Sequence, residues 1–224
     1  MKKKILVILS VSILLGIVCF IGFKIYTGKF GNKTRYDNSY FGIETYKSNV
    51  DKDNDGIDDQ TDILNNVRDY IATKPQYESK YYAGGYPFDG YGVCTDVVAF
   101  GLRGAGYDLR ELVNEDIKNN SEKYNIKVRD KNIDYRRVRN LLIYLEGNSI
   151  NLSTDIKNKD EWQGGDIVVF STHIGIVSDK RNKKGIPYVI HHERPYQEEY
   201  EEDILGSRKN DIKAHFRVSE FFRN

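Results

Sequence analysis

Cys94 is the residue of this chain best placed to act as a nucleophile. The only other cysteine, Cys19, lies inside an apolar N-terminal segment. Cys94 follows the glycine-containing run 90–93 and precedes a segment with helical spacing, so we predict that it stands at the start of a helix. Backbone N–H groups and the positive end of a helix stabilise a thiolate, which is the nucleophilic form of cysteine. The alternative is that Cys94 is a small buried apolar residue, the commonest role of a free cysteine.

Histidine is the partner that such a thiol needs. His173 opens one predicted strand and His191 ends the next, so a meander would bring the two imidazoles side by side. One imidazole can then accept the proton of the Cys94 thiol, and a third polar group can orient the ring. His192 and Glu193 are alternatives to His191 in that orienting role. A Cys/His zinc site would use the same residue types, but dispersed histidines and one cysteine lack the close ligand spacing of structural zinc.

Residues 51–62 carry a second chemical pattern, in which aspartates alternate with other residues and a glycine stands at the sixth position. Alternating hard oxygen donors and a glycine at the bend are typical of a calcium loop. The register predicts a structural Ca²⁺ site with the ligands Asp51, Asp53, Asp55, Ile57, Asp59 and Asp62. Asp62 stands where such loops usually have a bidentate glutamate, and its shorter side chain is expected to weaken the site. A solvated acidic turn that caps the next helix is the alternative.

These residues must be positioned by helices and strands. The sequence predicts helices in the first half of the domain and strands in the second half. Apolar residues at helical spacing indicate helices over residues 61–72, 94–104, 109–119 and 135–146. Short β-rich runs separated by turns follow at 166–170, 173–178, 187–191 and 214–218. This order predicts an α+β fold, with N-terminal helices packed on a small antiparallel sheet. Trp162 and His215 are expected to serve the core and not the chemistry.

The N-terminus carries a membrane signal. A basic start is followed by the uncharged apolar run 5–23, which at about 1.5 Å per residue reaches across the ~30 Å hydrocarbon core of a bilayer. No Ala-x-Ala-like cleavage site precedes Lys24, which favours an uncleaved anchor over a secretory signal peptide. The bulky Val18 before Cys19 argues against the alternative of a lipid attached at Cys19. The lysines at positions 2–4 favour a cytoplasmic N-terminus and an extracytoplasmic domain. Secretion after signal cleavage is the alternative.

The chain is predicted to divide into three parts. Residues 1–24 form the transmembrane anchor or signal, residues 25–48 a polar tether, and residues 49–224 one domain of ordinary size. A formal net charge of +1 gives no case for a nucleic-acid partner. Since the domain holds a single cysteine, it cannot form an internal disulfide and must be stabilised by its core.

Four motifs occur in an order that resembles the NlpC-type papain-like cell-wall hydrolases. They are Tyr81-Tyr82-Ala83-Gly84-Gly85, Cys94-Thr95-Asp96, the run 165–170 that begins Gly-Asp, and the run 173–177 that begins His-Ile-Gly. The run from about Tyr40 onward resembles more closely a bacterial family of unknown function within that superfamily. The resemblance implies a papain-like fold with Cys94 as nucleophile, His173 as general base and His191 as the third, polar member. Tyr81 matches the tyrosine that helps to hold the oxyanion region, with Tyr82 as the alternative.

The function implied by this resemblance is a membrane-tethered, extracytoplasmic cysteine hydrolase that needs no organic cofactor. Peptidoglycan or other cell-envelope peptides would supply its amide substrate. The chain departs from the superfamily pattern at Thr95-Asp96, where small residues are usual. Asp96 could complement the helix dipole, select a cationic substrate or reduce the reactivity of the thiol. The alternative that Asp96 supports is a non-catalytic envelope-binding or scaffold domain of the same fold.

Overall fold

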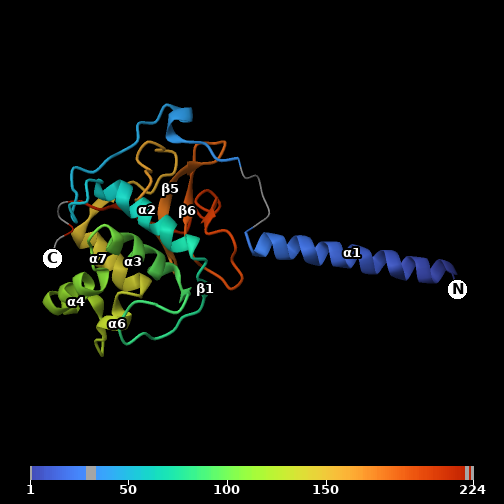
Figure 1. Ribbon diagram of the computed structural model, residues 1–224, viewed down its shortest axis with the longest axis horizontal. Helices are drawn as coiled ribbons and strands as arrows, with labels where there is room; N and C mark the ends of the chain where they lie inside the picture. The colour runs from blue at the N-terminus through green and yellow to red at the C-terminus, as the bar shows by residue number, and fades with distance from the viewer. Residues whose placement is uncertain (1, 29–33, 220–221, 223–224) are drawn as a thin grey trace.

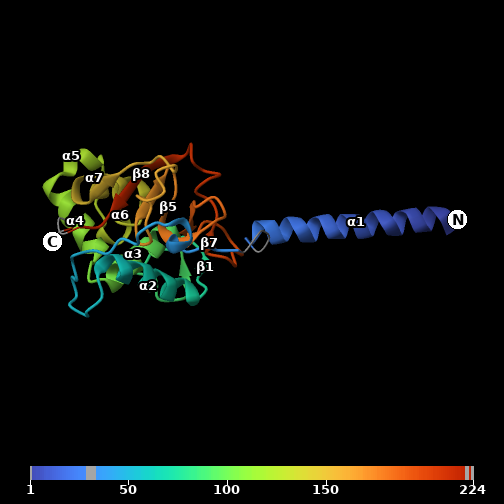
Figure 2. The same cartoon turned by 90° about the horizontal axis from the view of Figure 1, so that it is seen from above.

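The computed structural model describes residues 2–28, 34–219 and 222. An apolar helix, α1 (Lys2–Tyr26), stands apart from the rest of the described chain (Figures 1 and 2). Among the described residues it is the one helix long and apolar enough to cross a membrane, over Lys3–Tyr26. A helix of this kind near an N-terminus serves either as a membrane span or as a signal sequence.

The first half of the domain is helical. Its long helices begin at polar caps or tight turns: the Asp58 carboxylate accepts the Thr61 N–H at the start of α2, and Asp108 accepts two N–H groups at the start of α4. The amphipathic helices α2 and α3 pack along each other. The helices are α2 (Asp59–Ala72), α3 (Cys94–Gly104), α4 (Leu109–Asn119), α5 (Ser121–Tyr124), α6 (Lys131–Asp134) and α7 (Val138–Asn148), with a 3-10 turn, η1 (Asn38–Phe41), before them.

The second half forms a six-stranded antiparallel sheet with the strand order β3-β8-β4-β5-β6-β7. A short parallel pair, β1 (Gln76–Tyr77) and β2 (Tyr91–Gly92), leads into α3. The predicted α+β class with a small antiparallel sheet is thereby confirmed. The sheet strands are β3 (Ile150–Leu152), β4 (Ile167–Phe170), β5 (Ile174–Arg181), β6 (Pro187–Ile190), β7 (Glu201–Glu202) and β8 (Ile212–Arg217).

Both faces of the sheet are buried, because alternate side chains of a strand point to opposite faces. Ile167 and Val169 of β4 join the large core formed with the helices, whereas Val168 and Phe170 join a smaller core on the other face. Trp162 lies fully buried in that smaller core. The central strands β4 and β6, buried at every position, therefore read as continuous apolar runs and not as alternating ones.

A buried polar network ties the sheet to α2 through Asp166. Its carboxylate accepts hydrogen bonds from Gln60 Nε2 at 2.9 Å, from His215 Nε2 at 2.9 Å and from Arg217 Nε at 2.7 Å. The His215 ring stacks on Trp162 with a centroid distance of 3.8 Å. Asp166 of the Gly-Asp motif, like His215 and Trp162, therefore serves the core in this structure.

The described part of the segment predicted as a tether packs against the domain. Tyr36 forms a β-bridge with Arg181, and Asn38 Oδ1 accepts a hydrogen bond of 2.5 Å from the buried Arg181 guanidinium. Residues 34–48 are therefore not a free spacer, because their polar side chains satisfy buried groups of the sheet. Residues 29–33 of the predicted tether lie outside the described residues.

Candidate active site

Cys94 is the first residue of α3 and meets the sheet where β5 begins. The backbone N–H groups of Ile174 and Thr95 lie near its sulfur and act to lower the pKa of the thiol. Because Ile174 is the first residue of β5, the sulfur lies beside the strand end that His173 precedes. The helix–sheet junction predicted for the thiol therefore exists, although no hydrogen bond joins Cys94 Sγ to His173 among the described residues.

The two histidines form the middle of a buried hydrogen-bond chain. His173 Nε2 and His191 Nδ1 lie 3.0 Å apart, and His191 Nε2 lies 3.1 Å from Glu202 Oε2. A carboxylate only accepts hydrogen bonds, so neutral His191 carries its proton on Nε2 and accepts on Nδ1. His173 then donates through Nε2, and its Nδ1 is the nitrogen that remains to take a proton.

A fourth residue extends this chain to the end of α1. Arg194 donates to Glu202 Oε1 at 2.5 Å and, through Nε, to the backbone oxygen of Tyr26 at 2.5 Å. Glu202 and Arg194 were not predicted as site residues from the sequence. Nothing in their local sequence marks them, because antiparallel pairing of β6 with β7 brings Glu202 to His191.

Gly175 makes room for the histidine pair. The β5–β6 register places it opposite His191, and a Cβ at this position would lie 3.2 Å from His191 Cβ and 2.7 Å from Val189 Cγ1. The glycine of the His-Ile-Gly motif is thus explained by close packing between two strands.

Burial keeps the thiol and the imidazole uncharged. Desolvation, together with the charges of Asp96 and Glu193, raises the pKa of Cys94 to about 11, although two backbone N–H groups oppose this shift. Burial and the neighbouring His191 lower the pKa of His173 to about 2. The position of Cys94 at a helix start predicts a stabilised thiolate. In the structure desolvation outweighs that effect, so the thiol of Cys94 and the imidazole of His173 are both neutral.

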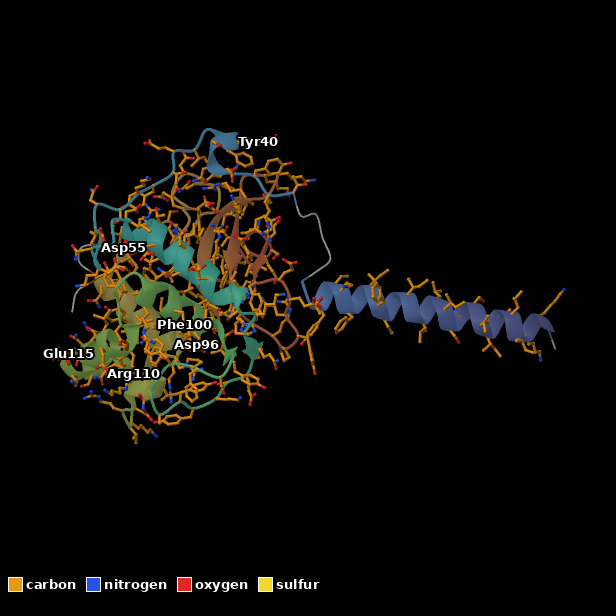
Figure 3. The ribbon with its side chains drawn as sticks, viewed as in Figure 1. Tyr40, Asp55, Asp96, Phe100, Arg110 and Glu115 are labelled. Atoms are coloured by element: carbon orange, nitrogen blue, oxygen red, sulfur yellow. The ribbon has the colours of Figure 1, made fainter. Side chains whose placement is uncertain are left out.

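Asp96, the departure from the superfamily pattern, is fully buried and does not face a substrate. Its carboxylate accepts hydrogen bonds of 2.8 Å from Arg136 Nε and from the backbone N–H of Val93. Figure 3 shows Asp96 and Phe100 together on α3, away from Asp55 in the loop before α2. Of the three roles considered for Asp96, selection of a cationic substrate is excluded by this burial.

The tyrosines occupy other places than the resemblance implies. Tyr81 is 59% exposed, and its hydroxyl bonds to Asn132 at 3.2 Å. Tyr82 is buried and donates to Asp89 at 2.8 Å. The structure therefore brings neither of them into hydrogen-bond contact with the cysteine or the histidines.

Tyr77 is the tyrosine that adjoins the site. Burial, and after it the neighbouring Cys94, raise the pKa of Tyr77, and the Tyr77 ring lies 5.3 Å from that of His192. Tyr77 also lines a cavity of about 770 Å³ between the segments 74–78 and 195–200, with Tyr91 and His192. Its position on a two-residue strand leaves no periodic signal in the sequence, so only the fold could reveal it.

The pH dependence of stability is expected to report on the buried histidines. Burial lowers the pKa of His192 to about 4 and that of His173 to about 2, from an ordinary value of 6.5. The unfolded chain therefore binds more protons below pH 6.5, and the free energy of unfolding should fall as the pH drops. For His192 this loss ends near pH 4 and amounts to at most about 3 kcal/mol.

Denaturant titrations from pH 7 to pH 4 in wild-type protein and in His192→Gln measure this contribution. The variant should show the shallower dependence. Burial and the charges of Asp55 and Asp53 raise the pKa of Asp62 to about 6, which acts in the opposite direction in both proteins and cancels in the comparison. Equal slopes for the two proteins would contradict the prediction.

The acidic loop gathers part of its predicted ligand set. Oxygen atoms of Asp51, Asp53 and Asp55 lie within 4.8 Å of one another. Asp59 instead faces the domain, where its carboxylate accepts the N–H of Lys52 at 2.8 Å and the hydroxyl of Tyr107. Ile57 donates its N–H to Asp55 at 2.8 Å. Asp62 lies in the first turn of α2.

The histidine pair could also be read as part of a metal site. Ligand atoms of His173, His191 and Glu193 lie within 4.8 Å of one another. Each has a protein partner, since the imidazoles bond to each other and Glu193 pairs with Arg208 at 2.7 Å. The groups are therefore satisfied by protein partners without an ion.

The fold and site define an α+β protein in which a cysteine at a helix start adjoins a histidine pair on an antiparallel sheet. A family model described as a domain of unknown function (DUF1287) matches residues 64–218. The uncharacterized protein YijF of Escherichia coli (strain K12) is 39% identical over 168 residues, which cover 69% of this chain and 80% of YijF. The chain therefore belongs to the DUF1287 family. No solved structure matches it.

This membership corrects the assignment to the NlpC-type hydrolases, because DUF1287 is a distinct family. The motifs that suggested the NlpC-type assignment are short, and two of their residues have structural roles in this fold. Asp166 organises a buried polar network, and Gly175 allows close packing beside His191.

Proposed function

We propose that this protein is a membrane-tethered thiol hydrolase that cleaves amide bonds of cell-envelope peptides, including those of peptidoglycan. The observation that carries the proposal is the hydrogen-bond chain from Glu202 through His191 to His173. It leaves His173 Nδ1 as the basic nitrogen at the start of β5, and the backbone N–H of Ile174, the next residue, lies near the Cys94 sulfur. The predicted papain-like form of the fold is supported by this placement of the two groups on a helix and a sheet.

The reaction would begin with neutral groups. Cys94 Sγ attacks the substrate carbonyl as His173 Nδ1 takes the thiol proton, so that an S–C bond forms and the carbonyl oxygen gains the charge. Backbone N–H groups at the start of α3 would stabilise that oxyanion. The His173 proton then passes to the leaving amine as the C–N bond breaks, which leaves a thioester on Cys94. His173 next takes a proton from the attacking water and returns it to the Cys94 sulfur as the S–C bond breaks and the carboxylic acid leaves. His191 and Glu202 hold the ring of His173 and stabilise its charged form.

A substrate near the membrane is supported by the position of the cavity. Segment 195–200, which lines it, contacts the end of α1: the N–H of Glu198 donates to the backbone oxygen of Thr27 at 3.0 Å. Thr27 itself is fully buried. If α1 spans the bilayer, the cavity lies close to the lipid surface, where amides of the envelope peptides are within reach.

Cys94→Ala tests the proposal. The full chain in detergent is treated with a thiol-directed acyl probe, and the acyl-enzyme is detected by intact mass. Wild-type protein and Cys19→Ala, which removes the other cysteine, should both be acylated, whereas Cys94→Ala should lose acylation by at least about 10³-fold. A chelator included throughout should leave the rate unchanged. Acylation that persists in Cys94→Ala, or that disappears with the chelator, would refute the thiol mechanism.

A non-catalytic envelope-binding domain is the second candidate. It is favoured by the pKa of Cys94, raised to about 11 by burial, together with the lack of a direct hydrogen bond from the sulfur to His173. Incubation with muropeptides separates the candidates. A hydrolase releases products of lower mass, and a binding domain retains intact peptide.

A further inference from the structure

The loop before α2 gathers carboxylates around one point. Asp51 accepts the N–H groups of Asp55 at 3.1 Å and of Gly56 at 3.0 Å, and Gly56 has a φ of 92° that favours glycine. These bonds wrap the backbone around the side chains of Asp51, Asp53 and Asp55, whose oxygens lie within 4.8 Å of one another. An acidic turn of this kind is not by itself a metal site.

A buried carboxylate oxygen without a hydrogen-bond partner, in Asp62, is a second observation that points to a cation at this loop. Asp62 is only 6% exposed; its Oδ1 accepts a hydrogen bond of 2.7 Å from Asn66, but its Oδ2 has no hydrogen-bond partner. Asp55 and Asp53 are the charged groups that act on it most strongly. A buried carboxylate oxygen without a partner is costly, and nearby carboxylates increase that cost.

We propose that Asp51, Asp53, Asp55 and Asp62 bind one Ca²⁺ ion. Four carboxylates are hard anionic ligands, which suit a hard divalent cation, and a flexible loop suits Ca²⁺ better than the strict octahedral geometry of Mg²⁺. Asp59 is not among the ligands, because its carboxylate is engaged with Lys52 and Tyr107. The backbone carbonyl of Ile57 occupies the loop position that supplies a main-chain ligand.

The ion would stabilise the helical layer and takes no part in the chemistry of Cys94. A Cβ at Gly106, which follows α3, would lie 3.2 Å from Asp53 Cβ, so the loop packs directly against the α3–α4 turn. Asp62 belongs to α2, which packs along α3. Binding Ca²⁺ therefore joins the loop to both helices.

The test is thermal unfolding of the full chain in detergent, after metal is removed with a chelator. Added Ca²⁺ at a hundredfold excess over its Kd should raise Tm by roughly 5–10 °C. Mg²⁺ at the same concentration should raise it far less. No shift at millimolar Ca²⁺, or an equal shift with Mg²⁺, would overturn the proposal.

Two variants show whether these residues hold the ion. Asp62→Asn removes the buried charge, so it should keep or raise the Tm of the metal-free protein and lose the Ca²⁺ shift. Asp69→Asn, which removes an equal charge from an exposed position of α2, should keep the full shift. A Ca²⁺ shift that survives in Asp62→Asn, or that is lost in Asp69→Asn, would contradict the assigned site. A stable metal-free Asp62→Asn protein separates loss of binding from loss of folding.

Discussion

Replacing His173 with glutamine is expected to slow acylation of Cys94 by about 10²- to 10⁴-fold. Glutamine can still donate a hydrogen bond to His191 Nδ1, which lies 3.0 Å from His173 Nε2 in the wild-type protein. It cannot accept the proton of the thiol. Because burial raises the pKa of Cys94 to about 11, little thiolate exists at neutral pH without that base. The rate of acyl-enzyme formation by stopped-flow or quenched mass spectrometry measures the effect.

The rest of the hydrogen-bond chain gives graded controls for this result. His191→Gln and Glu202→Gln should each slow acylation less than His173→Gln, since they act by orienting His173 and stabilising its charged form. His192→Gln should slow it less than His191→Gln, because the His192 ring packs on Tyr77 and Tyr200, whereas the hydrogen bond to His173 comes from His191. His173→Gln protein that acylates at the wild-type rate would exclude His173 as the base. A larger loss in His192→Gln than in His191→Gln would assign the orienting role to His192.

Asp166→Ala is expected to lower the free energy of unfolding by about 3–5 kcal/mol. Asp166 is fully buried and bonds to the guanidinium of Arg217 and the imidazole of His215. The substitution therefore leaves both groups without this buried partner. Uncompensated buried donors cost far more than the net energy of one hydrogen bond. Urea unfolding followed by circular dichroism gives the change in midpoint.

Asp160→Ala is the matched control, because Asp160 is exposed and lies shortly before the same strand. It should change the stability by less than about 0.5 kcal/mol. Equal destabilisation by the two variants would show that the Asp166 network contributes little beyond its local turn.

The position of α1 bears on how the site is organised. Arg194 joins the backbone oxygen of Tyr26 to Glu202, which bonds to His191. The end of the apolar helix is therefore linked by hydrogen bonds to the candidate active site. In the proposed hydrolase this contact would fix the orientation of the site relative to the membrane.

Much of the local structure could be predicted because it depends on short-range periodicity. The helices predicted over 94–104 and 109–119 have the bounds of α3 and α4, and the strands were marked by β-rich runs between turns. The capping residues and the apolar N-terminal helix are equally local signals. Short-range patterns also predicted that Cys94 stands at a helix start, that His173 stands at a strand start and that residues 51–62 form an acidic loop.

The partners of these residues could not be predicted, because they come from distant parts of the chain. Glu202 reaches His191 through strand pairing, and Arg136 reaches Asp96 from a different helix–loop segment. The local dipole at the start of α3 favours a thiolate, but the burial imposed by the sheet reverses that preference. Asp59 likewise fits a ligand position by spacing, yet packing against Tyr107 turns it inward.

The sequence by itself determined the α+β class, the apolar helix at the N-terminus and which residues have the chemistry for a reactive site. Tertiary structure alone decided that Glu202 and Arg194 complete the histidine chain, that Asp96 is buried, and that Cys94 and His173 are neutral. The physical reason is that periodicity and side-chain chemistry are local properties. Hydrogen-bond partners and desolvation depend on which distant segments the strand register and helix packing bring together.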